Sequence, residues 1–181
     1  MSLTGFTPIF VQPPGTSFAD ATLRYLFKHP KKVRTDAELI SLVLAYEQGC
    51  ASTDLYLPFV LTQMVHETAG YTSMWSQPPR RNPAGIGVNG TTLPNGEPAG
   101  HWFPSDSLGV AGHLGRILAY AIAPGSGTEA QRRYIDFCLL FTPHPPRDRR
   151  RVTVAEVANT WAADSDYVPK LEALHAAILK A

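Results

Sequence analysis

The chain has 181 residues, of which 44% are hydrophobic, and its formal net charge is +1 at pH 7. These values are typical of one globular domain that folds around its own core, since single domains commonly span ~100–200 residues. The small net charge argues against a dedicated nucleic-acid binder, because that class needs a strongly basic surface to neutralise phosphates.

The amino-terminal part predicts an extended segment followed by two helices. Residues 1–16 contain three prolines and two glycines, which favour an extended lead-in. Capping patterns then open a helix over residues 17–29, which stops at Pro30, and a second helix over residues 35–49, which ends at Gly49. The single domain is therefore expected to span residues 17–181.

A third helix is predicted from Leu57 to Gly70, with Pro58 in its first turn. Its apolar residues recur at spacings of three and four and form one buried stripe: Leu57, Val60, Leu61, Met64, Val65 and Thr68. Glu67 therefore lies in the last turn of a core helix.

Residues 76–104 are rich in proline and glycine and contain two Asn-Gly pairs. Such turn chemistry predicts a small irregular β-hairpin lobe or lid that forms the wall of a cleft. Helices resume over residues 105–122, 128–140 and 167–179, and Thr153 begins a further capping box. The predicted fold class is α+β and mainly α.

Glu67 is followed by Gly70, so the motif is HETAG and not the HExxH of zinc proteases, which need a second histidine. A carboxylate at the negative end of a helix dipole and near apolar packing has a raised pKa, which suits a general acid. The alternative is a glutamate that faces solvent or pairs with an arginine. His66 points about 100° away from Glu67 on a helix, so Gln63 is the better candidate neighbour.

Three groups of residues carry a family resemblance. The first two are Gln63, Met64, His66, Glu67, Thr68, Ala69, Gly70, Thr72 and Ser73, and then Asn82, Pro83, Gly85 and Ile86. The third is WAADSDYVPK, residues 161–170. Together they resemble the bacterial endo-β-N-acetylglucosaminidase family of autolysin-type peptidoglycan hydrolases, in the lysozyme superfamily. The three motifs stand in family order between about Thr35 and Ile178.

The resemblance implies a lysozyme-like helical domain in which Glu67 is the general acid. The family takes its second carboxylate from the hairpin region, where Glu97 is the candidate to activate water or stabilise the transition state. Glu97 can also be read as a solvated turn residue, in which case the acetamido group of the substrate could assist instead. Asp106 is also within range, but its place beside Ser105 at a helix start favours a capping role.

The resemblance also implies which residues contact the glycan. Where family members often have a tyrosine near the catalytic centre, this chain has Trp161, which can stack on a sugar but has no hydroxyl. Asn82 is expected to be a structural hydrogen-bonding residue of a turn, and Tyr167 can be read as a packing residue. The candidate substrate-binding residues are Gln63, Ser73, Trp75, Asn82, Trp102, Trp161 and Tyr167.

The expected function is therefore hydrolysis of the β-1,4 glycan backbone of peptidoglycan, with no metal or cofactor. One alternative is a glycan-binding domain of the same fold that has lost turnover. Another is a wall-peptide hydrolase with a metal or a cysteine nucleophile, although Cys50 and Cys138 have no evident catalytic setting. Two basic clusters, Lys28–Arg34 and Arg147–Arg151, are either solvated faces or parts of an anionic-polymer surface.

The sequence also bears on location. It has no apolar run of ~18 residues that would predict a membrane span. Residues 1–15 lack the charged start and apolar core of a signal peptide. We therefore expect no membrane insertion, and export to the cell envelope would require a signal outside this chain.

Overall fold

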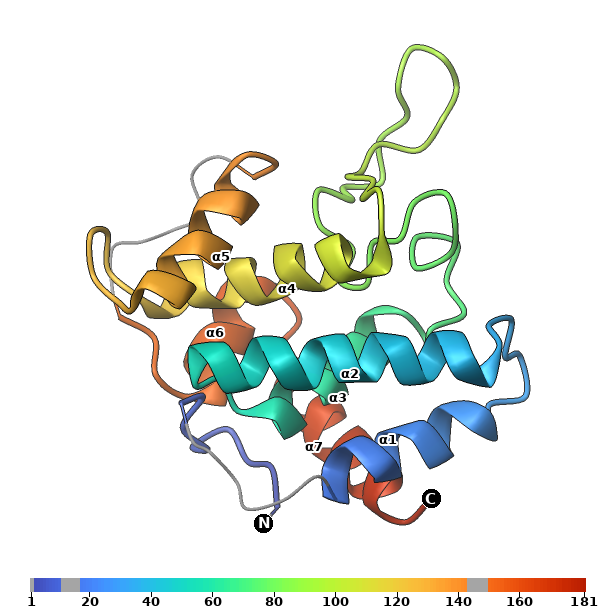
Figure 1. Cartoon of the computed structure of the whole chain (residues 1–181), viewed down its shortest axis with the longest axis horizontal. Helices are drawn as coiled ribbons and strands as arrows, with labels where there is room; N and C mark the ends of the chain where they lie inside the picture. The colour runs from blue at the N-terminus through green and yellow to red at the C-terminus, as the bar shows by residue number, and fades with distance from the viewer. Residues whose placement is uncertain (1, 11–16, 143–149) are drawn as a thin grey trace.

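The computed structural model describes residues 2–10, 17–142 and 150–181, and these residues form a mainly helical protein (Figure 1). Its helices within this part of the chain are α1 (Ser17–Phe27), α2 (Asp36–Thr53), α3 (Leu57–Glu67), α4 (Asp106–Ala121), α5 (Glu129–Leu139), α6 (Val154–Trp161) and α7 (Tyr167–Leu179). Each predicted helix is present, so the mainly helical expectation is confirmed.

Helix α2 continues beyond its predicted end at Gly49 and stops before Asp54, whose left-handed φ of 60° ends it. Gly49 is needed for close packing and not as a stop signal. A Cβ at this position would lie only 2.3 Å from Leu114 Cδ1 of α4. The start of α2 is as predicted, since Thr35 and Glu38 form the reciprocal capping box.

Helix α3 lies in the core and packs against α1, α2 and α7. Eight consecutive residues, from Pro58 to Val65, are buried, so this helix is covered on every side over two turns. It ends at Glu67, three residues earlier than predicted. Ala69, Gly70 and Tyr71 follow with positive φ values of 50°, 72° and 61°, which reverse the chain direction.

Helices α4 and α5 approach each other closely because α4 carries small residues on the contacting face. A Cβ at Gly115 would lie 2.1 Å from the carbonyl oxygen of Tyr134 in α5. Larger side chains at this position would push the two helices apart. The close packing fixes the position of α4 against α5. Arg116 and Tyr120, which follow Gly115 in α4, are therefore held where they reach the candidate site.

The described amino-terminal residues contain a turn in which Thr7 N donates to the carbonyl of Thr4 (2.9 Å), and they then contact the domain. Ile9 N donates to the carbonyl of Val152 (2.9 Å), and Tyr56 N donates to the carbonyl of Ile9 (2.7 Å). These bonds connect the segment to the starts of α3 and α6. Residues 11–16 of the predicted lead-in lie outside the described residues.

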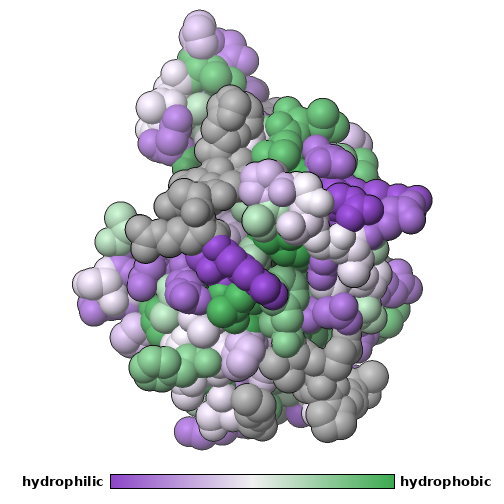
Figure 2. Space-filling view, turned by 90° about the vertical axis from the view of Figure 1, so that its left-hand side faces the viewer, coloured by the Kyte–Doolittle hydropathy of each residue, from purple (hydrophilic) through white to green (hydrophobic). Residues whose placement is uncertain are grey.

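The predicted β-hairpin lobe differs from the structure. Over residues 76–104 the described chain has no strand and only one isolated bridge, between Thr92 and Pro98. Proline has no N–H to donate to a neighbouring strand, and glycine has no side chain to pack on a sheet. The segment therefore forms turns in place of strands. The tip of this loop projects from the body in both views (Figures 1 and 2).

The surface that carries α5 and α6 mixes hydrophilic and hydrophobic residues (Figure 2). In the first basic cluster, Arg34 is not solvated but buried, and it forms ion pairs with Glu38 and Asp106. Residues 147–149 of the second cluster lie outside the described residues. Within the described part of the chain, no helix is long and apolar enough to cross a membrane.

Candidate active site

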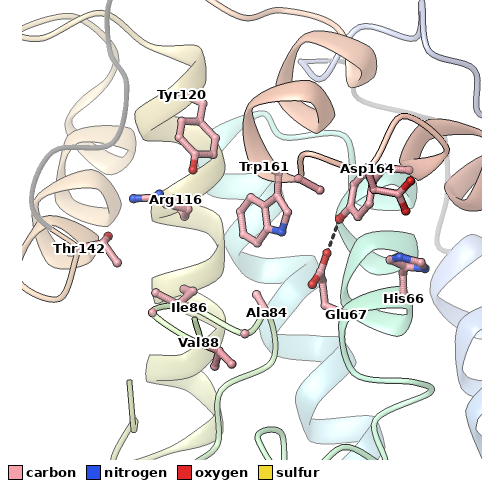
Figure 3. A pocket seen from close by; sticks show the side chains of 14 residues that line it. His66, Glu67, Ala84, Ile86, Val88, Arg116, Tyr120, Thr142, Trp161 and Asp164 are labelled. Atoms are coloured by element: carbon pink, nitrogen blue, oxygen red, sulfur yellow. Dashed lines mark hydrogen bonds between the residues drawn. The ribbon is translucent and has the colours of Figure 1, made fainter. Parts of the chain in front are cut away.

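An open cavity of about 620 Å³ lies where the end of α3 meets α4, α6, the start of α7 and the loop 84–88 (Figure 3). This volume is in the usual range of ligand pockets, ~300–1,000 Å³. The residues that line it are His66, Glu67, Ala84, Gly85, Ile86, Gly87, Val88, Arg116, Tyr120, Thr142, Trp161, Ala162, Asp164 and Tyr167.

Glu67 lines this cavity at the carboxyl end of α3 and is half-buried. Burial raises the pKa of its carboxyl above the usual value, against a smaller opposite effect of hydrogen bonds from Tyr167 and Trp161. Among the described residues no arginine forms an ion pair with it. The pKa of Glu67 is therefore raised in the expected direction, and the alternative of an arginine-paired or freely solvated glutamate does not describe this residue.

Tyr167 is the first residue of α7, and its hydroxyl donates a hydrogen bond to Oε1 of Glu67 (Figure 3). Its pKa is raised by burial and by the adjacent carboxyl, so it remains a protonated donor. The ring also contacts His66 edge-on, at 5.1 Å between centroids. Tyr167 therefore does more than pack, and it supplies the hydroxyl that Trp161 lacks.

Behind Glu67 a chain of buried hydrogen bonds runs into the core. Gln63 Nε2 donates to the Tyr167 hydroxyl (3.0 Å), and Gln63 Oε1 lies 3.1 Å from His113 Nε2. The Tyr46 hydroxyl lies 2.9 Å from His113 Nδ1. Gln63, His113 and Tyr46 are all fully buried.

The chemistry of these groups fixes the direction of every bond in the chain. An amide oxygen only accepts, so His113 must donate from Nε2, and its Nδ1 accepts from Tyr46. Burial lowers the pKa of His113 to about 3, which keeps the ring neutral as this tautomer requires. All donors therefore point toward Glu67. Gln63, predicted to bind substrate, instead orients Tyr167 from inside the core.

Trp161, the last residue of α6, faces the cavity beside Glu67 (Figure 3). Its indole N–H lowers the pKa of Glu67 through a hydrogen bond. The ring packs on His113, at 5.4 Å between centroids, and edge-on against Tyr120 at 6.2 Å. Trp161 is thus held in place from behind, and it is half-buried with one side toward the cavity.

Asn82 is fully buried and shapes the opposite wall of the cavity without entering it. Its Nδ2 donates to the carbonyls of Ile86 (2.9 Å) and His101 (3.0 Å), and its Oδ1 accepts from Ile86 N (2.9 Å). These bonds hold Gly85 and Gly87 at positive φ values of 60° and 73°. The predicted structural role of Asn82 is the one the structure shows.

Glu97, the predicted second carboxylate, is exposed in the projecting loop and does not line the cavity. Its amide N–H donates to Asn95 Oδ1 (3.1 Å), and its carbonyl accepts from Leu93 N (2.7 Å). Both contacts belong to a tight turn. The structure therefore does not bring Glu97 together with Glu67.

Within the described ranges, Asp164 is the other carboxylate that lines the cavity. It lies in the linker between α6 and α7 and forms an ion pair with Lys170 (2.5 Å). The hydrogen bond from Lys170 lowers the pKa of Asp164, and His66 has the same effect. Asp164 is exposed and remains ionised near neutral pH.

Asp106 was expected to cap α4, but Ser105 caps it, because its side chain accepts from Leu108 N (3.2 Å). The Asp106 carboxylate instead binds Arg34 at 2.9 Å and the Tyr71 hydroxyl at 3.3 Å. This partly buried ion pair connects α4 to the loop before α2. Its role is structural.

Three further predicted residues also lie outside the cavity lining. Ser73 is part of a local turn in which its Oγ accepts from Ser76 N (3.3 Å). Trp75 and Trp102 both pack against Arg80. Of the candidate site residues, the structure brings Glu67, Trp161 and Tyr167 together at one cavity.

The two cysteines are buried, and neither forms a disulfide. Burial raises the pKa of both thiols, so neither is an activated nucleophile. Within the described residues no three of the histidine, cysteine, aspartate and glutamate side chains come together in a way that could hold a metal ion.

Sequence reasoning missed His113, Arg116, Tyr120 and the role of Asp164. His66 was set aside because of its angle to Glu67, yet it lines the same cavity. The i, i+3 pair His113 and Arg116, on an otherwise apolar helix, was the available signal.

Comparison with known protein families, with characterised proteins and with solved structures finds no match to this chain.

Proposed function

We propose that this chain is a lysozyme-like glycoside hydrolase of the bacterial cell wall. It cleaves the β-1,4 glycan backbone of peptidoglycan as an endo-β-N-acetylglucosaminidase, with Glu67 as general acid. The observation that carries the proposal is the half-buried Glu67 carboxyl, raised in pKa and bonded to Tyr167 at the edge of a 620 Å³ cavity. The resemblance of the three sequence motifs supports the same reaction.

Glu67 suits the acid step because its two oxygens have different surroundings. Tyr167 donates to Oε1 and Trp161 also donates to the carboxyl, and in the proposed acid form the proton lies on Oε2. A raised pKa keeps a larger share of the carboxyl protonated near neutral pH, where it can donate to the glycosidic oxygen as the bond to C1 breaks. General acid catalysis of this kind contributes roughly 10²–10⁴-fold in rate.

The second step does not need Glu97. In the first step, as the bond to the leaving oxygen breaks and that oxygen takes the proton of Glu67, the carbonyl oxygen of the 2-acetamido group bonds to C1 from the opposite face and forms a cyclic oxazolinium ion; the second step is attack by water. Glu67, now ionised, takes a proton from water as the water oxygen bonds to C1 and the ring of the intermediate opens. The product keeps its configuration at C1, and Glu67 is protonated again.

The remaining cavity residues suit a sugar polymer. Trp161 offers an indole to the apolar face of a pyranose ring, and the cavity is partly open to solvent, as an internally cleaved chain requires. Arg116 and Asp164 provide charged hydrogen-bonding groups near the rim. A cell-wall substrate also implies that the protein acts outside the cytoplasm.

The direct test is release of reducing sugar ends from purified peptidoglycan by the parent chain and by Glu67→Gln. We expect at least a 100-fold loss of rate in Glu67→Gln, because an amide cannot donate the proton. Glu97→Gln is the matched control, since it makes the same chemical change outside the cavity, and it should retain nearly full activity. Equal activity of Glu67→Gln and the parent would remove Glu67 as the acid.

The second candidate function is glycan binding without turnover. The observation that favours it is the state of Asp164, which is ion-paired with Lys170 and is the only other carboxylate that lines the cavity among the described residues. Co-sedimentation with peptidoglycan separates the two functions. Equal binding by the parent chain and Glu67→Gln, with no reducing ends from either, would establish the binding domain and end the hydrolase proposal.

A further inference from the structure

Outside the cavity, two indoles enclose one guanidinium. The Arg80 guanidinium carbon lies 5.4 Å from the ring centroid of Trp75 and 5.1 Å from that of Trp102. We call these three residues the Arg80 stack. Contacts of a guanidinium with two aromatic faces restrict its plane, so its N–H groups have a defined direction.

The surrounding backbone is built to hold this arrangement. Phe103 N donates to the carbonyl of Arg80 (2.8 Å), which joins the two segments that supply the indoles. A Cβ at Gly100 would lie 2.4 Å from Trp75 Cη2, so a larger residue there would displace the indole. The stack is thus a fixed feature of the loop wall and not a chance contact of long side chains.

Arg80 lacks an anionic partner among the residues that the structure describes. Its Nε is buried without any hydrogen-bond acceptor, and no carboxylate forms an ion pair with the side chain. Arg34 also has a buried Nε without an acceptor, but its other nitrogens bind Glu38 and Asp106. Among the described residues, therefore, no carboxylate neutralises the charge of Arg80.

The stack is accessible and adjacent to the cavity. Trp102 is 41% exposed, and Arg80 is half-buried. Val88, which lines the cavity, also packs on Gly100 on the same side as Trp75, since a Cβ there would lie 2.9 Å from Val88 Cγ2. The cavity and the stack therefore share one wall, and a polymer bound in the cavity can extend over it.

We propose that the Arg80 stack is a second binding site, for a carboxylate carried by the glycan strand. The terminal Nη groups of Arg80, which unlike its Nε are not buried, bind the carboxylate, and the exposed part of Trp102 contacts the apolar face of the attached sugar. The identity of this ligand rests on the proposed function. Peptidoglycan carries carboxylates on the lactyl group of N-acetylmuramic acid and on its peptide stems, whereas chitin oligomers carry none.

The test measures binding to three probes in the Glu67→Gln background, which prevents turnover. The probes are glycan strands freed of peptide, with exposed lactyl carboxylates, strands that retain their peptides, and N-acetylglucosamine tetramers. We expect Arg80→Gln to weaken binding of at least one carboxylate-bearing strand about tenfold and of the tetramers less than twofold. Which strand loses affinity identifies the source of the carboxylate.

Two variants act as controls. Arg81→Gln removes the same charge from the neighbouring position and should change none of the three affinities. Arg80→Lys keeps the charge but not the paired N–H groups, so its affinities should lie closer to those of Arg80→Gln than to those of the parent. The ¹⁵N resonance of Arg80 Nε in the folded Glu67→Gln protein should shift with the carboxylate-bearing strand and not with the tetramers.

The proposal is overturned if Arg80→Gln binds every probe like the parent, loses all three equally, or if the parent binds no carboxylate-bearing strand. These outcomes are separate from the fate of the proposed function. A chain that hydrolyses peptidoglycan while Arg80→Gln binds normally retains the function and loses the second site. If binding depends on Arg80 but the chain with Glu67 intact does not hydrolyse peptidoglycan, the second site is retained and the proposed function is lost.

Discussion

Tyr167 donates a hydrogen bond to Glu67, joining the first residue of α7 to the last residue of α3, 100 positions apart in the sequence. Because the bond stabilises the ionised carboxylate, it opposes the effect of burial on the pKa of Glu67. It also leaves one carboxyl oxygen available for the proton. The first prediction concerns this bond.

Tyr167→Phe removes the hydroxyl and keeps the ring. The pKa of Glu67 should rise further, because a bond that lowered it is lost, and the alkaline limb of the pH–rate profile should move to higher pH. Gln63 loses an acceptor in the core, so unfolding should become easier by about 1–3 kcal/mol. A ¹³C titration of the Glu67 carboxyl and denaturant unfolding measure these two effects.

The control for this change is Tyr120→Phe, since Tyr120 also lines the cavity but makes no bond to Glu67 in the structure. Its Glu67 titration should match that of the parent. An unchanged or lowered Glu67 pKa in Tyr167→Phe would show that the bond does not act on the carboxylate.

His113 makes the stability of the protein depend on pH. Its folded pKa is lowered to about 3 by burial, below the value near 6.5 of an unfolded chain. Below pH ~6.5, His113 is therefore protonated in the unfolded state but stays neutral in the folded state. His113 should lower the free energy of unfolding by about 1.4 kcal/mol for each pH unit from ~6.5 toward 3.

The measurement compares denaturant unfolding of the parent and His113→Gln between pH 4 and pH 7. Glutamine can keep a donor toward Gln63 and an acceptor toward Tyr46, but it does not titrate in this range. The variant should show a flatter decline in stability on acidification. Parallel curves for the two proteins would mean that His113 takes up a proton in the folded state.

Much of the fold could be predicted because its signals are local. Capping boxes at Thr35 and Thr153 and the apolar period of residues 57–68 place helices that the structure contains. Gly49 misled the prediction, since a glycine that stops a helix and one that lets another helix approach look alike in sequence. Only packing distinguishes the two.

The site was predictable only in part. The position of Glu67 at a helix end follows from local periodicity, but the bond from Tyr167 depends on how α3 and α7 pack. Gln63 bonds to Tyr167 and His113 in other helices, and Asn82 bonds to His101 as well as to nearby Ile86, so their burial cannot be read from local sequence alone. Glu97 lies in a turn whose direction no local pattern gives.

Asn82 should be essential to the wall of the cavity. Asn82→Ala leaves the backbone groups of Ile86 and His101 without their partners, and we expect a loss of stability on the order of 3 kcal/mol. Asn89→Ala, in the exposed part of the same loop, should cost about 0.5 kcal/mol or less. Chemical denaturation gives both values, and similar losses at the two positions would refute this account of the loop.

Asp164 distinguishes the proposed two-step reaction from direct attack of water. If the acetamido group of the substrate assists, Asp164→Asn should lower kcat by less than about tenfold, since it removes a rim charge and not a reacting group. If Asp164 instead activates water, its loss should lower kcat by roughly 10²–10⁴-fold. The rate of reducing-end release decides between them, and inversion at C1 of the product would independently exclude acetamido assistance.

The central claim is tested most directly by digesting peptidoglycan in H₂¹⁸O and weighing the soluble fragments by mass spectrometry. The parent chain should release fragments that end in a reducing N-acetylglucosamine with one ¹⁸O at C1, and Glu67→Gln should release none above background. The account is contradicted if the parent releases no fragments, if the cut falls elsewhere in the wall, or if Glu67→Gln releases the same labelled ends.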